Sequence, residues 1–234
     1  MGGVVTVAGN DQVANPNPPK RSGKCHLLLA GLVALLIFFP LLEDINRPVI
    51  QVMCLTLPFL AGVLVADSGR ADVRRAFVLA AIQLGLAGMS FAVPEKDNGY
   101  PILLSIELLA TVILILFSTR CLGRYILQSP VVTRDEIYAG VCMYIMLGFA
   151  FGALFYILNT LSPGSFSTGD SSAHGGHPAL IYFSFVTLAT LGYGDITPRS
   201  DFARSLSVIE ALVGMLFIAI FMARLVSMRT DRDK

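Results

Sequence analysis

The sequence predicts an all-α membrane protein with six transmembrane helices and a seventh, shorter helix that enters the membrane without crossing it. Of the 234 residues, 55% are hydrophobic and only 14% are charged, whereas soluble domains average about 25% charged residues. Six long apolar segments each approach or reach the roughly 20 residues that a helix needs to cross the hydrocarbon core. They lie at residues 25–42, 49–66, 76–93, 101–118, 137–161 and 203–226.

The seventh apolar segment, residues 178–189, is too short to span a membrane. As a helix it rises about 18 Å, against about 30 Å of hydrocarbon. We therefore expect a re-entrant helix, followed by non-helical backbone that is buried in protein or lines water. Pro178 suits the first turn of this helix. Its negative dipole end, near Ala189, favours a cation.

The chain divides into five parts by composition. We expect a disordered cytoplasmic tail at 1–24, a four-helix transmembrane block at 25–118, a cytoplasmic interfacial linker at 119–136, a second transmembrane unit at 137–228 and a short cytoplasmic tail at 229–234. With the N-terminus inside, thirteen of the 17 basic residues fall in inner segments, as the positive-inside rule requires. This predicts a multi-pass protein of the cell membrane with both termini cytoplasmic.

Several smaller features shape expectations for packing and partners. A net charge of +1 provides no basic surface for nucleic acid, and the four cysteines are scattered, so we expect free thiols. Pro58 is expected to kink the second span. Gly85 and Gly88 are expected to permit close packing in the third span, and Gly148 and Gly152 in the fifth.

The most informative stretch, residues 190–195, follows the re-entrant segment and reads Thr-Leu-Gly-Tyr-Gly-Asp. Gly192 and Gly194 can adopt positive φ at little cost, which breaks the usual alternation of carbonyl directions along a strand. Carbonyls aligned in this way replace the hydration shell of a permeating cation. Leu191 and Tyr193 would then point away from the ion and brace the strand.

Residues 187–195, Thr-Leu-Ala-Thr-Leu-Gly-Tyr-Gly-Asp, are similar to the signature of the potassium channel superfamily, and they lie between two apolar spans as that signature does. The resemblance is strong over residues 137–228 and extends to the first four spans only in number and topology. It implies a selectivity filter made by Thr190, Leu191, Gly192, Tyr193 and Gly194, with K⁺ coordinated at the first four. It also implies passive K⁺ conduction, with K⁺ as the only bound cofactor and no organic one.

One filter strand cannot surround an ion. We therefore expect a homotetramer with four copies about a common axis. The compact chain resembles prokaryotic channels with six transmembrane segments that lack an Arg-rich voltage sensor and a cytoplasmic regulatory domain.

The resemblance also suggests which residues support the filter. Tyr182 and Asp195 correspond to an aromatic–acid pair that forms a hydrogen bond behind the filter, and the Thr187 hydroxyl is placed to brace the strand. Val186 stands where some similar channels carry a buried glutamate, so that partner of Asp195 is absent here.

Two residues of the last span are gating candidates. Gly214 falls at the position of a hinge glycine in similar channels, although a packing role fits equally well. Glu210 is an acid within an apolar span, and such acids normally face protein or water. It could attract cations, sense pH, or donate as a protonated acid to the end of the re-entrant helix, and we favour the last two readings. Glu107, in the fourth span, is expected to pair with helix backbone or another span.

Voltage sensing is not expected to be steep. The fourth span, 101–118, contains no Lys or Arg, and Arg120 and Arg124 lie beyond its inner end, whereas a sensor needs several basic residues within one span. Lipid, protons, tension or a separate regulatory protein remain open as gating stimuli. The basic end, residues 224–234, is expected to touch anionic lipid head groups.

Three alternative functions are compatible with parts of the sequence. The Gly-x-Gly-Asp element at 192–195 also fits an intramembrane aspartyl protease, but that enzyme needs a second aspartate within another span, and none lies there. A transporter would be expected to repeat the re-entrant element. A less selective monovalent cation channel remains the nearest alternative.

His174 and His177, in the loop 159–177, could bind a metal or protons, although a solvated loop is the preferred reading.

Overall fold

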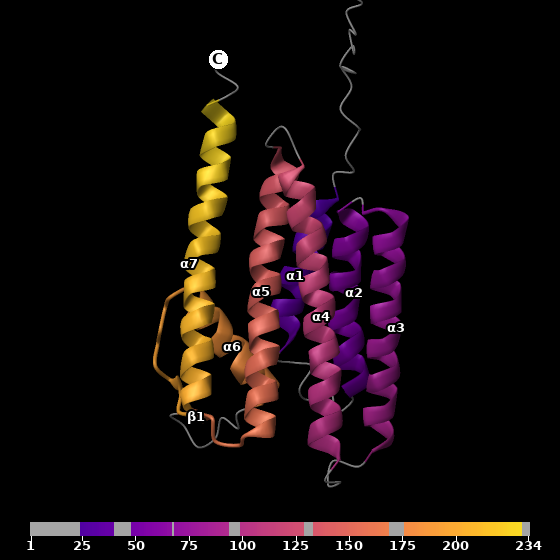
Figure 1. Cartoon of the computed structure of the whole chain (residues 1–234), viewed down its shortest axis with the longest axis vertical. Helices are drawn as coiled ribbons and strands as arrows, with labels where there is room; N and C mark the ends of the chain where they lie inside the picture. The colour runs from indigo at the N-terminus through magenta and orange to yellow at the C-terminus, as the bar shows by residue number, and fades with distance from the viewer. Residues whose placement is uncertain are drawn as a thin grey trace, which may run out of the picture.

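The computed structural model describes residues 24–39, 48–66, 68–93, 99–128, 133–168 and 176–230. These residues form seven helices and one two-stranded sheet (Figure 1). The helices are α1 (Cys25–Phe38), α2 (Pro48–Val65), α3 (Arg70–Ala92), α4 (Tyr100–Leu127), α5 (Arg134–Leu161), α6 (His177–Leu188) and α7 (Asp201–Thr230). The strands are β1 (Phe166–Thr168) and β2 (Ile196–Pro198). The tail expected at 1–24 lies outside the described residues except for Lys24, as do residues 231–234.

Four helices are long and apolar enough to cross a membrane. They are α4, α5, residues Arg70–Ser90 of α3 and residues Asp201–Val226 of α7. The protein is therefore a multi-pass membrane protein with four candidate spans. Helix α1 has 14 residues and rises about 21 Å, and the side chains of α2 are described only from Thr56. Crossing by these two helices stays a prediction.

The helix that contains the expected fourth span, 101–118, is longer than that span. Helix α4 continues to Leu127, so the first half of the expected linker 119–136 is helical. The extension is stabilised because Cys121, Leu122, Tyr125 and Ile126 are buried in the main core cluster, at spacings that place them on one helix face.

Helix α5 begins where the capping chemistry predicts a helix start. The Thr133 hydroxyl accepts a hydrogen bond from the Asp135 N–H at 3.3 Å. In return the Thr133 N–H donates to Glu136 Oε2 at 2.7 Å. This reciprocal arrangement is a capping box, and it leaves only a short connection between α4 and α5.

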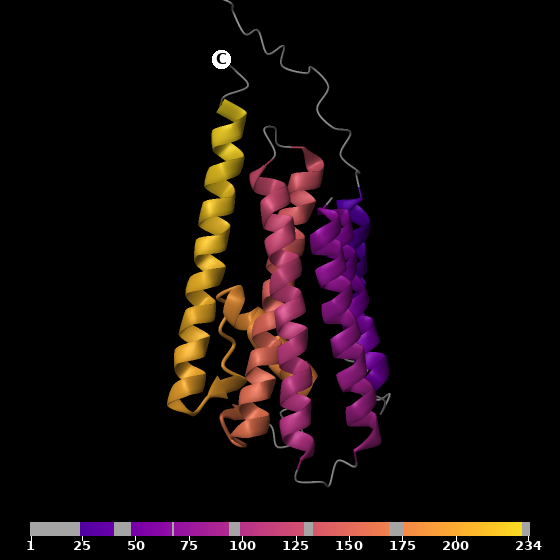
Figure 2. The same cartoon turned by 45° about the vertical axis from the view of Figure 1, so that its right-hand side comes forward.

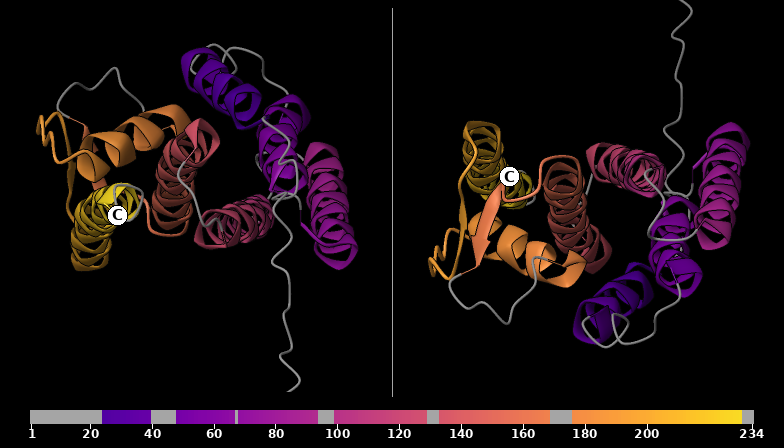
Figure 3. Two further views of the ribbon diagram at one scale, coloured as in Figure 1. Left: turned by 90° about the horizontal axis from the view of Figure 1, so that it is seen from above. Right: turned by 90° about the horizontal axis from the view of Figure 1, so that it is seen from below.

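Helix α5 occupies the centre of the arrangement. It packs against α1 and α4 on one side and against α6 and α7 on the other, as the views along the bundle axis show (Figure 3). Helix α6 lies beside α5 and α7 over only part of their height (Figure 2). Its 12 residues thus form a short helix beside two spans, which is the placement expected of a re-entrant segment.

An aromatic side chain of α5 lies between the end of α1, α2 and α6. The Phe149 ring is fully buried, with 1% of its surface exposed. Its centroid lies 6.0 Å from that of Phe39, 6.1 Å from that of Phe59 and 5.6 Å from that of Phe185 on α6. The four-helix block is therefore connected, through this ring of α5, to the helix that precedes the candidate site.

The close helix packing that was expected at glycines is confirmed in α5, and the same expectation is wrong in α3. A Cβ on Gly148 would lie 2.5 Å from the Phe185 ring, and one on Gly152 would lie 2.9 Å from the Ile181 Cα. These two glycines let α6 approach α5 closely. Around Gly85 and Gly88, however, nothing lies within 4 Å of an added Cβ, because that part of α3 faces open space. Pro58 lies inside α2 without ending it.

The buried acid of α4 pairs with another helix, as expected. Ser90 on α3 donates from its hydroxyl to Glu107 Oε2 at 2.6 Å. One α-helical turn further along α4, Thr111 Oγ1 accepts a hydrogen bond of 2.9 Å from the Gln83 side-chain amide of α3. The two hydrogen bonds connect α3 and α4 by polar contacts inside an otherwise apolar block.

Candidate functional site

The stretch between α6 and β2 has an unusual backbone. Thr190 has φ 57°, Gly192 has φ 60° and Gly194 has φ 80°, so every second residue is in the left-handed region. Positive φ was expected at the two glycines but not at Thr190, because a β-branched residue rarely adopts it. Such a residue costs on the order of 1–3 kcal/mol and persists only where its surroundings impose it.

The last turn of α6 imposes this conformation through its carbonyl oxygens. The Thr190 N–H donates to the Thr187 carbonyl at 2.9 Å. The N–H groups of Leu191 and Gly192 both donate to the Val186 carbonyl, at 2.9 and 3.4 Å. Three main-chain hydrogen bonds therefore connect the start of the 190–195 stretch to the C-terminal end of α6. Thr187 contributes its backbone here, whereas the expected bracing by its hydroxyl stays a prediction.

The outer end of the stretch is held by a small sheet that the sequence did not reveal. Strand β2 pairs antiparallel with β1, with Ser167 opposite Thr197, and the Arg199 N–H donates to the Ser165 carbonyl at 2.8 Å. Beneath the sheet, the rings of Phe155, Phe166 and Phe183 contact one another with centroids 5.1–5.4 Å apart. A strand of three residues has too little periodicity to be predicted.

Tyr182 and Asp195 are brought together as expected. The Tyr182 side chain on α6 forms a hydrogen bond with the Asp195 carboxylate, and this bond raises the pKa of Tyr182. It connects α6 to the outer end of the stretch, opposite the main-chain hydrogen bonds at its start. The contact is present, and its role in supporting the stretch remains a prediction.

The C-terminal end of α6 is also clamped between α5 and α7. The Tyr144 hydroxyl of α5 donates to the Leu188 carbonyl at 3.0 Å. From the other side, Gly214 of α7 approaches so closely that an added Cβ would lie 2.4 Å from the same carbonyl oxygen. Gly214 is therefore a close-packing residue in this structure, and its hinge role stays a prediction.

Glu210 lies one turn before Gly214 and is completely buried, with 0% of its surface exposed. Its Oε1 is hydrogen-bonded to the Ser184 hydroxyl of α6, and that hydroxyl lies 2.7 Å from the Gly148 carbonyl of α5. A serine hydroxyl has one proton. If it donates to the Gly148 carbonyl, Glu210 must be the donor in the other bond, which fits a protonated acid. Oε2 has no hydrogen-bond partner among the described residues.

The Glu210 contact predicts different outcomes for two substitutions. Glu210→Gln is expected to retain stability and ion selectivity, because an amide can donate to Ser184 as a neutral acid does, and to remove any pH dependence of gating that Glu210 provides. Glu210→Ala is expected to lose about 1–3 kcal/mol, the usual result of leaving a buried hydrogen-bond partner unpaired. Thermal denaturation in detergent and pH-dependent flux measure both effects.

Glu107, the other buried acid, provides the matched control. Glu107→Ala should also destabilise the protein while leaving selectivity unchanged, because its partner Ser90 is on α3. A large loss of ion selectivity in Glu210→Gln would contradict the assignment of Glu210 as a buried partner of Ser184 that does not contact the ion.

His177 is a packing residue at the start of α6. Its ring stacks on Tyr156 with centroids 4.8 Å apart and meets the edge of Phe39 at 5.2 Å. Burial lowers the pKa of His177 to about 4, so the ring is neutral at neutral pH. The solvated-loop reading is therefore wrong for His177. Its suggested partner in a metal site, His174, lies outside the described residues.

The candidate site consists mainly of exposed main chain and has few side chains suited to metal binding. Residues 190–195 are all exposed in the single chain. Within the described ranges, no group of three His, Cys, Asp or Glu side chains could hold a metal ion. Carbonyl oxygens are suitable ligands for a hard, weakly bound cation.

Comparison with known proteins places this region in a family. A family model described as "Ion channel" matches residues 140–231. The chain is 36% identical over 98 residues to "Two pore potassium channel c" of Oryza sativa subsp. japonica, which covers 42% of this chain and 21% of that relative. It is 44% identical over 57 residues to "Two-pore potassium channel 3" of Arabidopsis thaliana, covering 24% of this chain and 13% of that relative.

A bacterial relative is matched over most of its length. The chain is 30% identical over 96 residues to "Protein LctB" of Bacillus caldotenax, covering 39% of this chain and 71% of that protein. The chain spans about a fifth or less of the plant relatives. No solved structure matches the chain. The region that the family model matches contains most of α5, all of α6, the 190–195 stretch and α7. The chain belongs to the ion channel family and is not an enzyme.

Proposed function

We propose that the protein is a potassium-selective channel that conducts K⁺ down its electrochemical gradient. The observation that carries the proposal is the alternation of positive φ at Thr190, Gly192 and Gly194 within the sequence Thr-Leu-Gly-Tyr-Gly-Asp. A backbone of this kind can direct successive carbonyl oxygens to one side, where they replace the water around K⁺. The K⁺ ions would be held at residues 190–193.

The channel would be a homotetramer, because a single strand lines only part of a pore. Leu191 and Tyr193 expose 57% and 67% of their surface in the single chain. Helix α7 likewise carries a series of exposed apolar side chains: Val208, Ile209, Leu212, Met215, Leu216 and Ile218. Surfaces of this kind are normally covered by protein or lipid. Four copies about one axis would enclose the strand and cover part of α7.

The six-span topology belongs to the same proposal. In it, α1 and α2 cross the membrane together with the four longer spans, both termini are cytoplasmic, and residues 137–228 make the pore. The first four helices would lie outside their own pore unit, because α1 and α4 pack on α5 of the same chain and the connection from α4 to α5 is short. The similarity to proteins named as potassium channels supports K⁺ as the permeant ion.

Purified protein in liposomes tests the proposal. With K⁺ on one side and Na⁺ on the other, the reversal potential is expected to report a strong preference for K⁺. Native mass spectrometry is expected to find four chains of 25.2 kDa in each complex. Equal permeability to both ions would point to a less selective monovalent cation channel, and any other stoichiometry would contradict the shared filter.

A further inference from the structure

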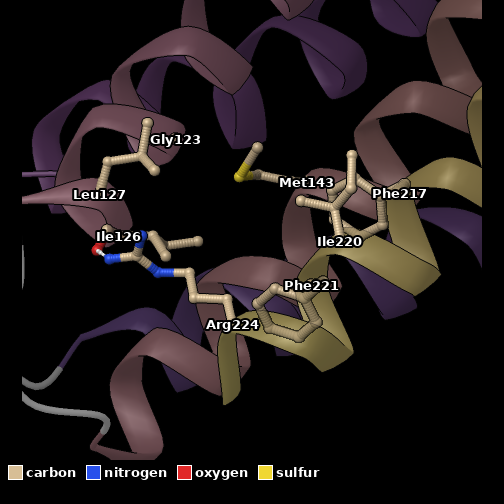
Figure 4. Close-up of a pocket in the computed structure, with 8 residues that line it drawn as sticks. All are labelled: Gly123, Ile126, Leu127, Met143, Phe217, Ile220, Phe221 and Arg224. Atoms are coloured by element: carbon tan, nitrogen blue, oxygen red, sulfur yellow. Dashed lines mark hydrogen bonds between the residues drawn. The ribbon is translucent and has the colours of Figure 1, made fainter. Parts of the chain in front are cut away.

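An apolar groove lies where the ends of α4 and α7 meet α5 (Figure 4). We call it the inner groove, and its apolar walls are formed by Gly123, Leu127, Met143, Phe217, Ile220 and Phe221. Its volume is about 220 Å³, which is space for roughly seven small groups of about 30 Å³ each. The groove is open to the surface of the single chain, so a flexible molecule can enter it.

The α7 wall of the groove is positioned by a tight contact with α5. The rings of Phe217 and Phe221 stack with centroids 5.8 Å apart. Phe221 fills the space above Gly140, where an added Cβ would lie only 2.1 Å from the ring. The Phe217 ring also meets the Tyr144 ring of α5, with centroids 5.7 Å apart. The inner part of α7 therefore packs on α5 through aromatic side chains, and a molecule in the inner groove would touch Phe217 and Phe221 directly.

Among the described residues, Arg224 is the only charged one that lines the groove. Its Nη2 donates to the Ile126 carbonyl at 2.6 Å, at the end of α4 (Figure 4). A guanidinium carries five N–H donors, and among the described residues Arg224 forms no ion pair with a carboxylate. The groove thus combines apolar walls with a positive charge that has unused donors, which matches the composition of an anionic amphiphile.

The charge of the lipid head group, and not the hydrophobicity of its tails, would decide which lipid binds in the groove. Lipid tails are as apolar as leucine, so an acyl chain gains little from the apolar walls alone. A phosphate group near Arg224 gains a charge-assisted hydrogen bond. Thirteen of the 17 basic residues fall on the inner side in the proposed topology, which puts the groove in the leaflet that carries anionic lipids.

We propose that the inner groove binds an anionic phospholipid, with one acyl chain along the Phe217–Phe221 wall and the head group at Arg224. Bound there, the lipid would connect the end of α4 to the inner part of α7. The proposal concerns lipid binding and does not depend on which ion the channel conducts.

The absence of tryptophan from the chain allows a direct test. Ile220→Trp places a single fluorescent reporter in the groove wall, at a side chain that is 67% exposed and can be enlarged without repacking. The protein is reconstituted in vesicles of equal parts phosphatidylglycerol and phosphatidylcholine, with bromine, a fluorescence quencher, on only one of the two lipids. Swapping the brominated lipid changes the quencher and leaves the bilayer composition unchanged.

Phosphatidylglycerol is expected to quench the reporter about fivefold more effectively than phosphatidylcholine, the factor for one basic residue near an anionic lipid surface. Arg224→Gln should bring this ratio to about one. The matched control, Arg120→Gln, removes an exposed arginine of α4 that does not line the groove, and it should leave the ratio unchanged. A reporter at Leu116→Trp, on the exposed face of α4, measures the surrounding lipid and should show little preference.

Three results would overturn the proposal. Equal quenching by both lipids would mean that the groove takes lipid without regard to charge. A preference that survives Arg224→Gln would place the anionic lipid elsewhere. Quenching at Leu116→Trp but not at Ile220→Trp would mean that another copy or another segment covers the groove. If Ile220→Trp does not assemble, Leu127→Trp on the opposite wall provides the same readout.

Discussion

Replacing Gly192 with alanine is expected to reduce K⁺ flux by more than about a hundredfold. Nothing lies within 4 Å of an added Cβ at this position, so the effect does not come from crowding within the chain. It comes from φ 60°, since a left-handed conformation costs an alanine roughly 1–2 kcal/mol. Four copies in one ring add to about 4–8 kcal/mol, and each 1.36 kcal/mol on a barrier changes a rate about tenfold.

The matched control for this substitution is Gly164→Ala. Gly164 has φ 86° and also has nothing within 4 Å of an added Cβ, but it lies in the turn before β1 and is not part of the 190–195 stretch. It should carry a similar backbone strain and retain K⁺ flux. Both variants are measured in liposomes after assembly is confirmed. Wild-type K⁺ flux and selectivity in Gly192→Ala would mean that positive φ at this position is not needed for conduction.

Gly214→Ala is expected to destabilise the protein by about 1–3 kcal/mol per chain, the usual effect of overpacking. The added Cβ would lie 2.4 Å from the Leu188 carbonyl oxygen and 3.1 Å from Leu188 Cδ1. The carbonyl cannot move freely, because it accepts a hydrogen bond from Tyr144. Helix α7 must therefore shift away from the end of α6. Because the 190–195 stretch is hydrogen-bonded to that end of α6, we expect its position to change as well.

Gly85→Ala makes the opposite prediction in another helix. Nothing lies within 4 Å of an added Cβ at Gly85, so the substitution should stabilise α3 by up to about 1 kcal/mol through helix propensity. Thermal denaturation in detergent and flux in liposomes compare the two variants. If Gly214→Ala kept its stability and changed only the fraction of open channels, the hinge reading would replace the packing reading.

Some features could be predicted because they depend on short stretches of sequence. Apolar length identified the membrane class, and the short segment before the glycines identified α6 as too short to span. The pairing of Tyr182 with Asp195 came from the family signature. The small residues Gly148 and Gly152 indicated a close helix contact, although the same reasoning failed at Gly85 and Gly88, since sequence does not say which face of a helix meets a neighbour.

Other features depend on contacts between distant parts of the chain. Glu210 was recognisable as a buried acid, but its contact with Ser184 required α6 and α7 to be placed side by side. The extension of α4 to Leu127 depends on burial against the rest of the core. His177 and Phe39 are far apart in the sequence, and nothing local indicates that their rings meet.

Apolar length and backbone freedom are local properties, so they already identify a membrane protein in which a short helix precedes a strand with two glycines. How the two ends of that strand are held depends on the tertiary structure. The adjacent last turn of α6 holds the left-handed Thr190, but the small sheet, the contacts of Tyr144 and Gly214 with Leu188, and the groove beside Arg224 all arise where distant segments meet. A residue's own chemistry limits what it can do, and these distant neighbours decide how the ends of the stretch are held.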